Sequence, residues 1–183
     1  MTRGVVIGKF YPPHLGHSYL IETALSQIDH LDVIVCVRPD QSIPGSLRSQ
    51  WLKHLHPRAN VIEVQDFCDD DNSARWAQFT VQTLGYKPDL VFTSEHYGKP
   101  YAHAMGAKHV MVDLDRVKVP IAASAIRSNP LEHLKYLAPI VRAFFVKRVC
   151  LVGAESTGTT TMSRLLAEEV QHDLGPRIWP RIL

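Results

Sequence analysis

The sequence of 183 residues lacks the features that export a protein or anchor it in a membrane. Its amino terminus has no apolar stretch followed by a small-residue cleavage site, and no apolar run approaches the length of a membrane span. Cys36, Cys68 and Cys150 show no paired spacing, and Cys36 and Cys150 lie in strand-like runs, so we expect both to be reduced core residues. These absences predict a cytoplasmic protein that does not bind membranes.

An excess of one charge is also lacking, since the formal net charge is +2 and the Lys and Arg residues are spread along the chain. No basic run interleaved with aromatic residues occurs, so nothing in the sequence predicts nucleic-acid binding. Internal repeats, low-complexity tracts and Gly/Ser linkers are absent, and the composition changes only near Phe145. We therefore expect a main domain over residues 1–146 and treat residues 147–183 separately.

The sequence does contain short β-branched runs that alternate with helix-compatible segments. Strands are predicted at 4–8, 31–37, 60–64, 89–93 and 108–112, and helices at roughly 16–28, 46–55, 73–84 and 100–105. Asn129, followed by Pro130 and Glu132, predicts one more helix with Asn129 as its N-cap. Continuous apolar strands separated by helices indicate a doubly wound, Rossmann-like α/β domain whose parallel sheet is covered on both faces. Ligands bind such sheets at the carboxyl ends of the strands.

The first predicted strand runs into Gly8-Lys9-Phe10-Tyr11-Pro12-Pro13-His14-Leu15-Gly16-His17, after which a helix begins. We expect Gly8 to permit a tight turn and Gly16 to let a ligand approach the backbone. The amino terminus of the helix offers free N–H groups to an anion, and His14 and His17 project to one side of its first turn. The two histidines could instead be a surface pair or half of a metal site. The loop offers no third metal ligand, so we favour a phosphate site and predict no metal site.

His-x-Gly-His after a first strand resembles the signature of the nucleotidyltransferase superfamily, which transfers a nucleotidyl group from a nucleoside triphosphate to a phosphate. The second motif of that superfamily is Ser-x-x-Arg, matched by Ile121-Ala122-Ala123-Ser124-Ala125-Ile126-Arg127. The form of the first loop, with several later stretches, resembles the adenylyltransferase domain of NadR-type proteins, which join nicotinamide-nucleotide adenylyltransferase to ribosylnicotinamide kinase. This resemblance covers about residues 4–165. It implies the sheet of the His-x-Gly-His type and the transfer of AMP from ATP to nicotinamide mononucleotide, giving NAD and pyrophosphate.

The resemblance also implies roles for individual residues. The catalytic candidates are His14, His17, Arg127 and Lys9. The ATP-binding candidates are Gly8, Lys9, Phe10, His14, Gly16, His17, Ser124, Ile126 and Arg127, of which Ser124 and Arg127 would hold the β- and γ-phosphates. The acceptor phosphate is already largely ionised at neutral pH, so no general base is required. Mg²⁺ held mainly by the ATP phosphates would assist the transfer.

The mononucleotide side is less well defined by the sequence. Trp51 and Trp76 are candidates for binding the pyridinium ring, because an indole face attracts a flat aromatic cation. Arg48 and Arg116 are candidates for the 5′-phosphate. Either Trp could instead be a core residue, and the acidic run at residues 69–71 could be a solvated loop or could help to seat the ring. The sequence does not predict a preference between nicotinamide and nicotinate mononucleotide.

The last part of the chain resembles the start of the kinase domain of the same proteins. Residues 148–152 predict a strand, and the glycine-rich loop after it departs from the P-loop pattern because threonine replaces the lysine. The residues of this degenerate P-loop are Gly153, Gly158, Thr159 and Thr160. One strand and one helix cannot bury a core. We therefore interpret residues 147–183 as a fragment of a P-loop kinase domain with an irregular tail, and expect no ribosylnicotinamide kinase activity from this chain.

Two other functions stay open at this point. One is the same chemistry on another small phosphate acceptor, such as pantetheine phosphate or FMN. The other is a non-catalytic module that senses ATP or NAD, which the intact His14, His17, Ser124 and Arg127 disfavour. The resemblance is also compatible with a homo-oligomer.

Overall fold

The computed structural model describes residues 1–66, 72–147 and 149–169. The chain divides into two compact units, Met1–Val146 and Lys147–Leu183. Among the described residues, all strands lie in the first unit, and the second unit contains one helix, α7 (Thr159–Glu169). The interpretation of residues 147–183 as a kinase fragment stays a prediction.

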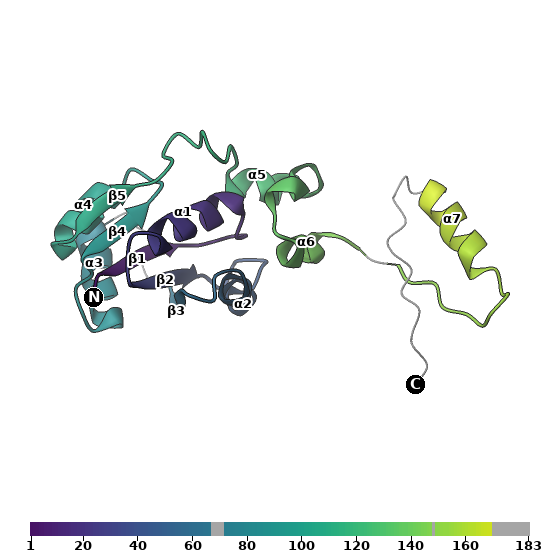
Figure 1. Ribbon diagram of the computed structural model, residues 1–183, viewed down its shortest axis with the longest axis horizontal. Helices are drawn as coiled ribbons and strands as arrows, with labels where there is room; N and C mark the ends of the chain where they lie inside the picture. The colour runs from purple at the N-terminus through teal and green to yellow at the C-terminus, as the bar shows by residue number, and fades with distance from the viewer. Residues whose placement is uncertain (67–71, 148, 170–183) are drawn as a thin grey trace. The chain divides into compact units, whose positions relative to one another are not determined.

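The first unit is built on a parallel sheet of five strands (Figure 1). They are β1 (Arg3–Gly8), β2 (His30–Val37), β3 (Asn60–Gln65), β4 (Leu90–Thr93) and β5 (Lys108–Met111). Their order is β3-β2-β1-β4-β5, and every neighbouring pair is parallel. The predicted parallel α/β sheet is therefore confirmed, and each of the five strands predicted between residues 4 and 112 agrees with the structure to within one residue at either end.

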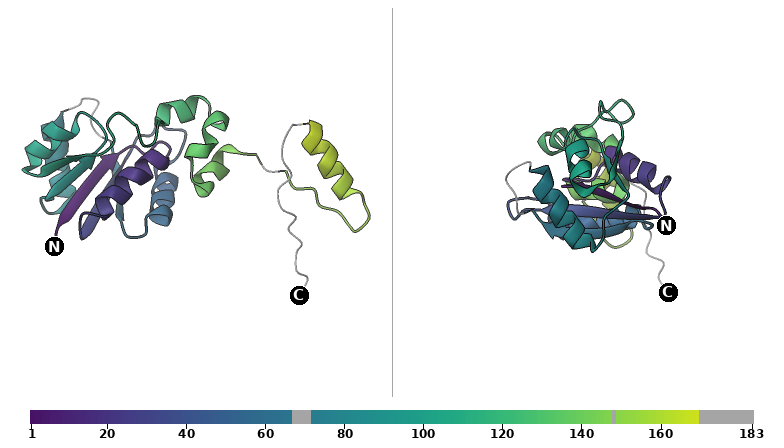
Figure 2. Two further views of the ribbon diagram at one scale, coloured as in Figure 1. Left: turned by 45° about the horizontal axis from the view of Figure 1, so that its top comes forward. Right: turned by 90° about the vertical axis from the view of Figure 1, so that its left-hand side faces the viewer.

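Helices cover both faces of the sheet, as the two views of Figure 2 show. α1 (Leu15–Leu25) and α2 (Gly45–Leu55) lie on one face, whereas α3 (Ser73–Leu84) and α4 (Gly98–Met105) lie on the other. Successive residues of β1 show why: Val6 packs in the cluster that contains Ile21 of α1, and Val5 packs in the cluster that contains Tyr101 of α4. Side chains alternate across a strand, so a fully apolar strand supplies both cores at once.

The strand order reverses at β1, which has β2 on one side and β4 on the other. Loops that leave neighbouring parallel strands at such a point turn to opposite faces and leave a crevice at the carboxyl ends. The loop between β1 and α1 opens onto this crevice. The fold therefore places residues 9–14 where ligands bind in doubly wound sheets.

A third apolar cluster contains the last helices of the first unit. It joins α5 (Ala123–Ser128) and α6 (Pro139–Phe145) to Trp51 of α2, with Ile126 and Val141 fully buried. Between these helices lies a 3₁₀ helix, η1 (Leu131–Tyr136), whose start has no side-chain cap. The prediction of Asn129 as an N-cap is wrong. The backbone N–H of Asn129 donates to the carbonyl of Ala125, so this residue ends the preceding helix instead.

The strand predicted at residues 148–152 does not form over the described residues 149–152. Val149 and Val152 are 72% and 88% exposed. An apolar run needs a neighbouring strand to pair its backbone groups and a layer to cover its side chains. The described residues of the second unit supply neither.

The two cysteines predicted to be core residues differ in the structure. Cys36 lies inside β2 and is buried, as predicted. Cys150 is exposed, so its prediction as a core residue is wrong, because the strand that was to bury it is absent. Cys68 lies outside the described residues.

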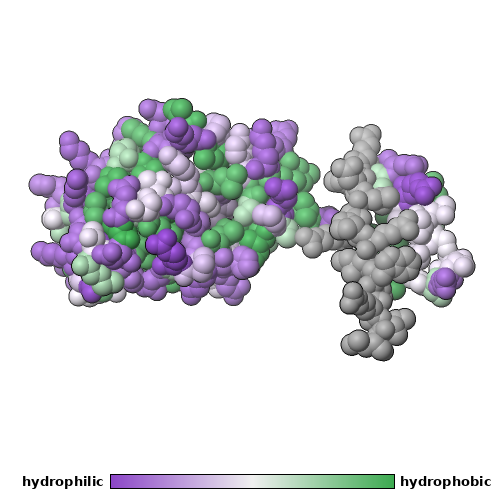
Figure 3. Space-filling view, viewed as in Figure 1, coloured by the Kyte–Doolittle hydropathy of each residue, from purple (hydrophilic) through white to green (hydrophobic). Residues whose placement is uncertain are grey.

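The surface of the first unit mixes hydrophilic and hydrophobic residues. In Figure 3 hydrophilic residues make up most of its rim, and hydrophobic ones show between them toward the middle of the face. Within the described ranges, no helix has the length and apolar character needed to cross a membrane. The homo-oligomer considered from the sequence stays a prediction.

Candidate active site

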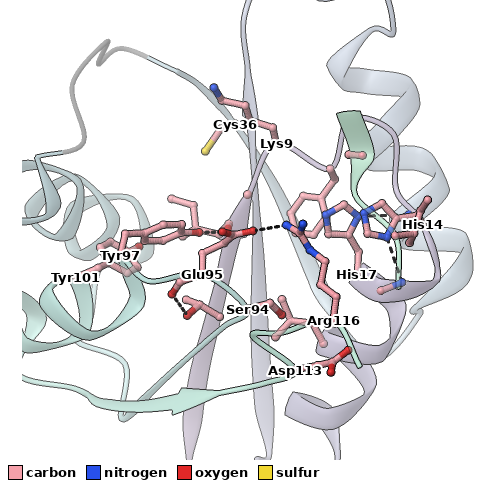
Figure 4. Close-up of a pocket in the computed structure, with 18 of the residues that line it drawn as sticks. Lys9, His14, His17, Cys36, Ser94, Glu95, Tyr97, Tyr101, Asp113 and Arg116 are labelled. Carbon is pink, nitrogen blue, oxygen red and sulfur yellow. Dashed lines mark hydrogen bonds and ion pairs between the residues drawn. The ribbon is translucent and has the colours of Figure 1, made fainter. Parts of the chain in front are cut away.

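A cavity of about 490 Å³ lies at the carboxyl ends of the strands. Each strand contributes to its wall with a residue at or just beyond its end: Gly8, Arg38, Asp66, Ser94 and Asp113. Figure 4 shows how the side chains from these separate segments converge. The volume is in the range of small-molecule sites.

Two histidines form a reciprocal cap at the start of α1. The Nδ1 atom of His14 accepts a hydrogen bond from the N–H of Gly16 at 3.1 Å, and Nδ1 of His17 accepts from the N–H of His14 at 3.3 Å. The two rings stack with their centroids 3.7 Å apart, side by side on the cavity wall (Figure 4). Because both Nδ1 atoms accept, each neutral ring carries its proton on Nε2 and keeps one donor for a ligand.

Burial keeps both rings neutral. It lowers the pKa of His14 to about 4, and the positive charge of Arg116 adds to the effect. Burial also holds the pKa of His17 well below its usual range, with further lowering from His14 and Arg116. The site therefore meets an anion at neutral pH with N–H donors and the positive end of the α1 dipole, rather than with imidazolium charges.

The structure adds a role for Gly16, whose predicted contact with a ligand stays a prediction, and it contradicts the predicted role of Gly8. A Cβ atom at Gly16 would lie 2.9 Å from Cε1 of His14, so glycine is needed there to make room for the capping ring. Gly8 is the last residue of β1, and the positive φ that turns the loop, 44°, belongs to Phe10. The prediction that Gly8 makes the tight turn is wrong. Phe10 is buried and packs edge-on against His17, with ring centroids 4.9 Å apart.

Lys9 enters the cavity from the loop after β1. Its Nζ lies 3.7 Å from Oδ2 of Asp66, which follows β3. More than half of the Lys9 side chain is exposed, whereas the Asp66 side chain is buried. Lys9 therefore brings an exposed positive charge to the cavity that the stacked histidines also line.

The second motif lies on α5, at the edge of the cavity. Ala123 lines the cavity, whereas Ser124, Ile126 and Arg127 are not among the lining residues. Nη1 of Arg127 donates to the carbonyl of Tyr11 at 2.6 Å, and the guanidinium lies 4.6 Å from the centroid of the Tyr11 ring. Ile126 is fully buried in the third cluster. The structure thus brings Arg127 against the first loop but leaves Ser124, Ile126 and Arg127 outside the cavity wall.

Arg116 reaches the cavity from the segment after β5. Its Nη2 lies 3.0 Å from Oε1 of Glu95, and the dashed line in Figure 4 marks this pair. Both side chains are about half exposed, so the pair contributes little energy and can exchange for a ligand phosphate. Asp113 holds this segment, because its carboxylate accepts hydrogen bonds from the N–H groups of Lys118 and Val119, which lower the pKa of Asp113.

The four candidates for mononucleotide binding separate into two pairs. Trp76 and Arg116 line the cavity. Trp51 does not: it is 4% exposed and packs in the third cluster, with its ring centroid 5.7 Å from that of Phe144. Arg48 is fully buried and donates to the backbone carbonyls of Lys9 and Cys36. The structure therefore corrects the prediction that these two residues bind the mononucleotide. Trp51 is a core residue, and Arg48 supports the backbone at Lys9 and Cys36. The acidic residues 69–71 lie outside the described residues.

Several lining residues were not recognised from the sequence as site candidates. They are Cys36, Asp66, Glu95, Tyr97, Tyr101 and Asp113. The signal was available for those that directly follow a predicted strand, because such positions meet at one edge of a parallel sheet. No group of three or more His, Cys, Asp or Glu side chains suited to a metal ion occurs within the described ranges.

Comparisons with known proteins agree with this geometry. No family model matches the chain. The trifunctional NAD biosynthesis/regulator protein NadR of Escherichia coli (strain K12) is 32% identical over 190 residues, which cover 91% of this chain and 46% of that protein. The nicotinamide-nucleotide adenylyltransferase of Caldivirga maquilingensis is 43% identical over 35 residues, covering 19% of this chain and 20% of that protein. A crystal structure of NadR protein in complex with NAD and AMP-PNP superimposes with a TM-score of 0.63 at 23% identity, covering 92% of this chain and 53% of that one.

The parallel sheet has the fold of the NadR crystal structure, and the His-x-Gly-His cap lies at the point where its strand order reverses. The chain is homologous to NadR, as the resemblance in its sequence predicted. The chain spans about half the length of the NadR relatives it matches.

Proposed function

We propose that this chain is a nicotinamide mononucleotide adenylyltransferase, which transfers AMP from ATP to nicotinamide mononucleotide and releases pyrophosphate. The observation that carries the proposal is the stacked His14–His17 cap at the start of α1, facing the cavity at the reversal point of the sheet. Homology to NadR, named for NAD biosynthesis, and the local likeness to a nicotinamide-nucleotide adenylyltransferase support the choice of product.

The reaction needs two anions brought into line. An oxygen of the acceptor phosphate attacks the α-phosphorus of ATP, and the bond from that phosphorus to the oxygen bridging toward the β-phosphate breaks. The acceptor is ionised at neutral pH, so no base has to remove a proton. Catalysis then consists of positioning and of stabilising the charge on the leaving pyrophosphate.

The residues of the first loop supply that stabilisation. The Nε2–H groups of His14 and His17 donate to phosphate oxygens, next to the free N–H groups of α1. Lys9 adds a mobile positive charge. Because the histidines are neutral, they hold the anion by directed hydrogen bonds and need not take up a proton first.

Arg127 and Ser124 are proposed to hold the β- and γ-phosphates. For this role Arg127 exchanges its hydrogen bond with the carbonyl of Tyr11 for one with a phosphate oxygen. It is exposed and lies next to the loop that carries the histidines, so the exchange requires a side-chain rotation only.

ATP is proposed to bind together with Mg²⁺, which neutralises phosphate charge when bound. The proposed ATP-contacting side chains His14, His17, Lys9 and Arg127 offer no oxygen ligand of the kind that Mg²⁺ prefers. The ion would therefore be held mainly by phosphate oxygens and water, as is usual for Mg²⁺.

On the acceptor side, Trp76 is proposed to stack on the pyridinium ring and Arg116 to bind the 5′-phosphate. Both line the cavity, and the Arg116 side chain forms a half-exposed ion pair with Glu95. A guanidinium matches a phosphate in geometry as well as in charge.

The test is a panel of acceptors given to the purified chain with ATP and Mg²⁺. Nicotinamide mononucleotide, nicotinate mononucleotide, pantetheine phosphate and FMN are assayed in parallel for pyrophosphate and for the joined product. We expect pyrophosphate and NAD in equal amounts with nicotinamide mononucleotide. Pyrophosphate release only with pantetheine phosphate or only with FMN would mean that this molecule, and not nicotinamide mononucleotide, is the acceptor. No release from folded protein that binds ATP would favour the sensing module.

A further inference from the structure

Tyr11, in the first loop, contacts the second motif through both its backbone and its ring. Its carbonyl accepts a hydrogen bond from Nη1 of Arg127 at 2.6 Å. The guanidinium of Arg127 also lies over the Tyr11 ring, 4.6 Å from the ring centroid. One tyrosine therefore holds the same guanidinium by two different contacts, across 116 positions of sequence.

The ring of Tyr11 is itself held in place. Its hydroxyl shares a hydrogen bond of 2.7 Å with the hydroxyl of Ser42 and accepts a second one from the Ser42 N–H at 2.8 Å. The guanidinium of the fully buried Arg48 lies over the ring, 5.4 Å from its centroid. The ring also packs against the third apolar cluster. These contacts make the Tyr11 ring a fixed platform beside the cavity rather than a freely rotating side chain.

The contact with the ring leaves Arg127 able to bind an anion. A cation over an aromatic face is attracted by the ring quadrupole, and this attraction uses none of the N–H groups of the cation. The guanidinium carries five N–H donors in a planar fork, so its edge can still reach a phosphate. Arg127 is exposed, and ordering a long exposed side chain on ligand binding costs conformational entropy. A platform that orders it beforehand lowers this cost.

Resting on the proposed function, we propose that Tyr11 is a positioning residue for Arg127, which keeps the guanidinium ready for the β- and γ-phosphates of ATP. When Arg127 exchanges the Tyr11 carbonyl for a phosphate oxygen, the ring still holds the guanidinium. Because His14 and His17 follow Tyr11 in the same loop, the donors of both motifs keep a fixed relation to each other. Tyr11 therefore strengthens binding of the triphosphate and does not affect a nucleotide that lacks the outer phosphates.

The experiment measures the affinity for ATP with Mg²⁺, and separately for AMP, by isothermal titration calorimetry without an acceptor. Tyr11→Leu removes the ring and is expected to weaken ATP binding by about three- to tenfold, the effect of one cation–π contact, and to leave AMP binding unchanged. Arg127→Ala is expected to weaken ATP binding as well. Adding Tyr11→Leu to Arg127→Ala should have little further effect, because Tyr11 acts through the guanidinium that is already gone.

Two further variants separate this role from a general effect on the fold. Tyr11→Phe keeps the ring and the carbonyl and loses only the hydroxyl contacts with Ser42, so its affinity for ATP should lie closer to the wild type than that of Tyr11→Leu. Tyr86→Leu removes a similar contact at the amino end of β1, where the Arg3 guanidinium lies 4.4 Å from the centroid of the Tyr86 ring. It should keep the affinity for both nucleotides.

An effect of Tyr11→Leu on ATP binding that is equally large with and without Arg127 would overturn the inference, since Tyr11 would then act independently of Arg127. Unchanged affinity for ATP in Tyr11→Leu, or an equal loss for ATP and AMP, would also overturn it. The proposed function fails separately, if the wild type binds ATP but transfers no AMP to nicotinamide mononucleotide. The coupling between Tyr11 and Arg127 is measured without an acceptor and does not depend on that result.

Discussion

The ring of His14 and the backbone of Gly16 determine each other at the start of α1. Nδ1 of His14 accepts from the Gly16 N–H at 3.1 Å, and a Cβ at position 16 would lie 2.9–3.0 Å from two atoms of the same ring. The middle glycine of His-x-Gly-His therefore keeps the first histidine in place as a cap, with its Nε2–H left for a ligand.

Gly16→Ala is expected to displace the His14 ring and remove the cap. The free energy of unfolding should fall by about 1–2 kcal/mol, the usual cost of losing an N-cap. Turnover should fall as well, because the Nε2–H donor of His14 is displaced with its ring. Urea unfolding followed by circular dichroism measures the first effect and pyrophosphate release the second. Unchanged stability with full activity would show that the loop accepts a Cβ and that the cap does not position His14.

His17→Ala removes one of the two Nε2–H donors. We expect kcat to fall by about 10²- to 10³-fold, the effect of deleting one donor that stabilises a charged transition state. The far-ultraviolet circular dichroism spectrum should not change. His54→Ala is the matched control, because His54 is an exposed histidine on α2 outside the cavity. Near-normal kcat in His17→Ala would contradict the role given to the cap.

The lowered pKa of His14 makes stability depend on pH. In the unfolded chain a histidine takes up its proton below about pH 6.5, whereas burial delays this in the folded chain to about pH 4. The unfolded state therefore binds more protons between these values, and stability is lost as pH falls through this window. The full effect of His14 is up to about 3 kcal/mol, and His14 adds no pH dependence above pH 7.

His14→Asn keeps a capping side chain but removes the titrating ring. Its free energy of unfolding should decline less steeply than that of the wild type between pH 6.5 and 4. His54→Asn serves as the control and should follow the wild type. Urea titrations at several pH values give the comparison. Parallel curves for wild type and His14→Asn would show that His14 is not the group responsible.

Arg116 is proposed to exchange Glu95 for the 5′-phosphate of the acceptor. Arg116→Ala should raise KM for nicotinamide mononucleotide by about tenfold or more, since a charge-assisted hydrogen bond is lost. The KM for ATP should change less. Arg164→Ala, an exposed arginine on α7, controls for the loss of one positive charge. An equal rise in both KM values would mean that Arg116 acts on the cavity in general.

The sequence predicted the sheet well because its central strands β1, β2 and β4 are buried on both faces. Runs such as residues 31–37 are apolar apart from Asp32 and rich in β-branched residues, and such runs have few alternatives in a chain of this size. The loop of His14 and His17 was also predicted, because its motif and its place after a first strand are both local features.

The rest depended on contacts between distant segments. Trp51 and Trp76 look alike in the sequence, and only the packing of α5 and α6 against α2 shows that Trp51 is buried in the core. Cys150 lies in an apolar run like that of Cys36, but it has no neighbouring strand among the described residues. Asp66 has its place in the cavity wall because β3 pairs with β2, a contact between distant segments of the chain.

The central claim is the transfer of AMP, and ATP labelled with ³²P at the α-phosphate tests it most directly. The chain is incubated with this ATP, Mg²⁺ and nicotinamide mononucleotide, and the products are separated. The account predicts that the label appears in NAD and that the pyrophosphate released is unlabelled and equal in amount. Label that appears in AMP or ADP, or that stays in ATP although the folded chain binds it, would contradict the account.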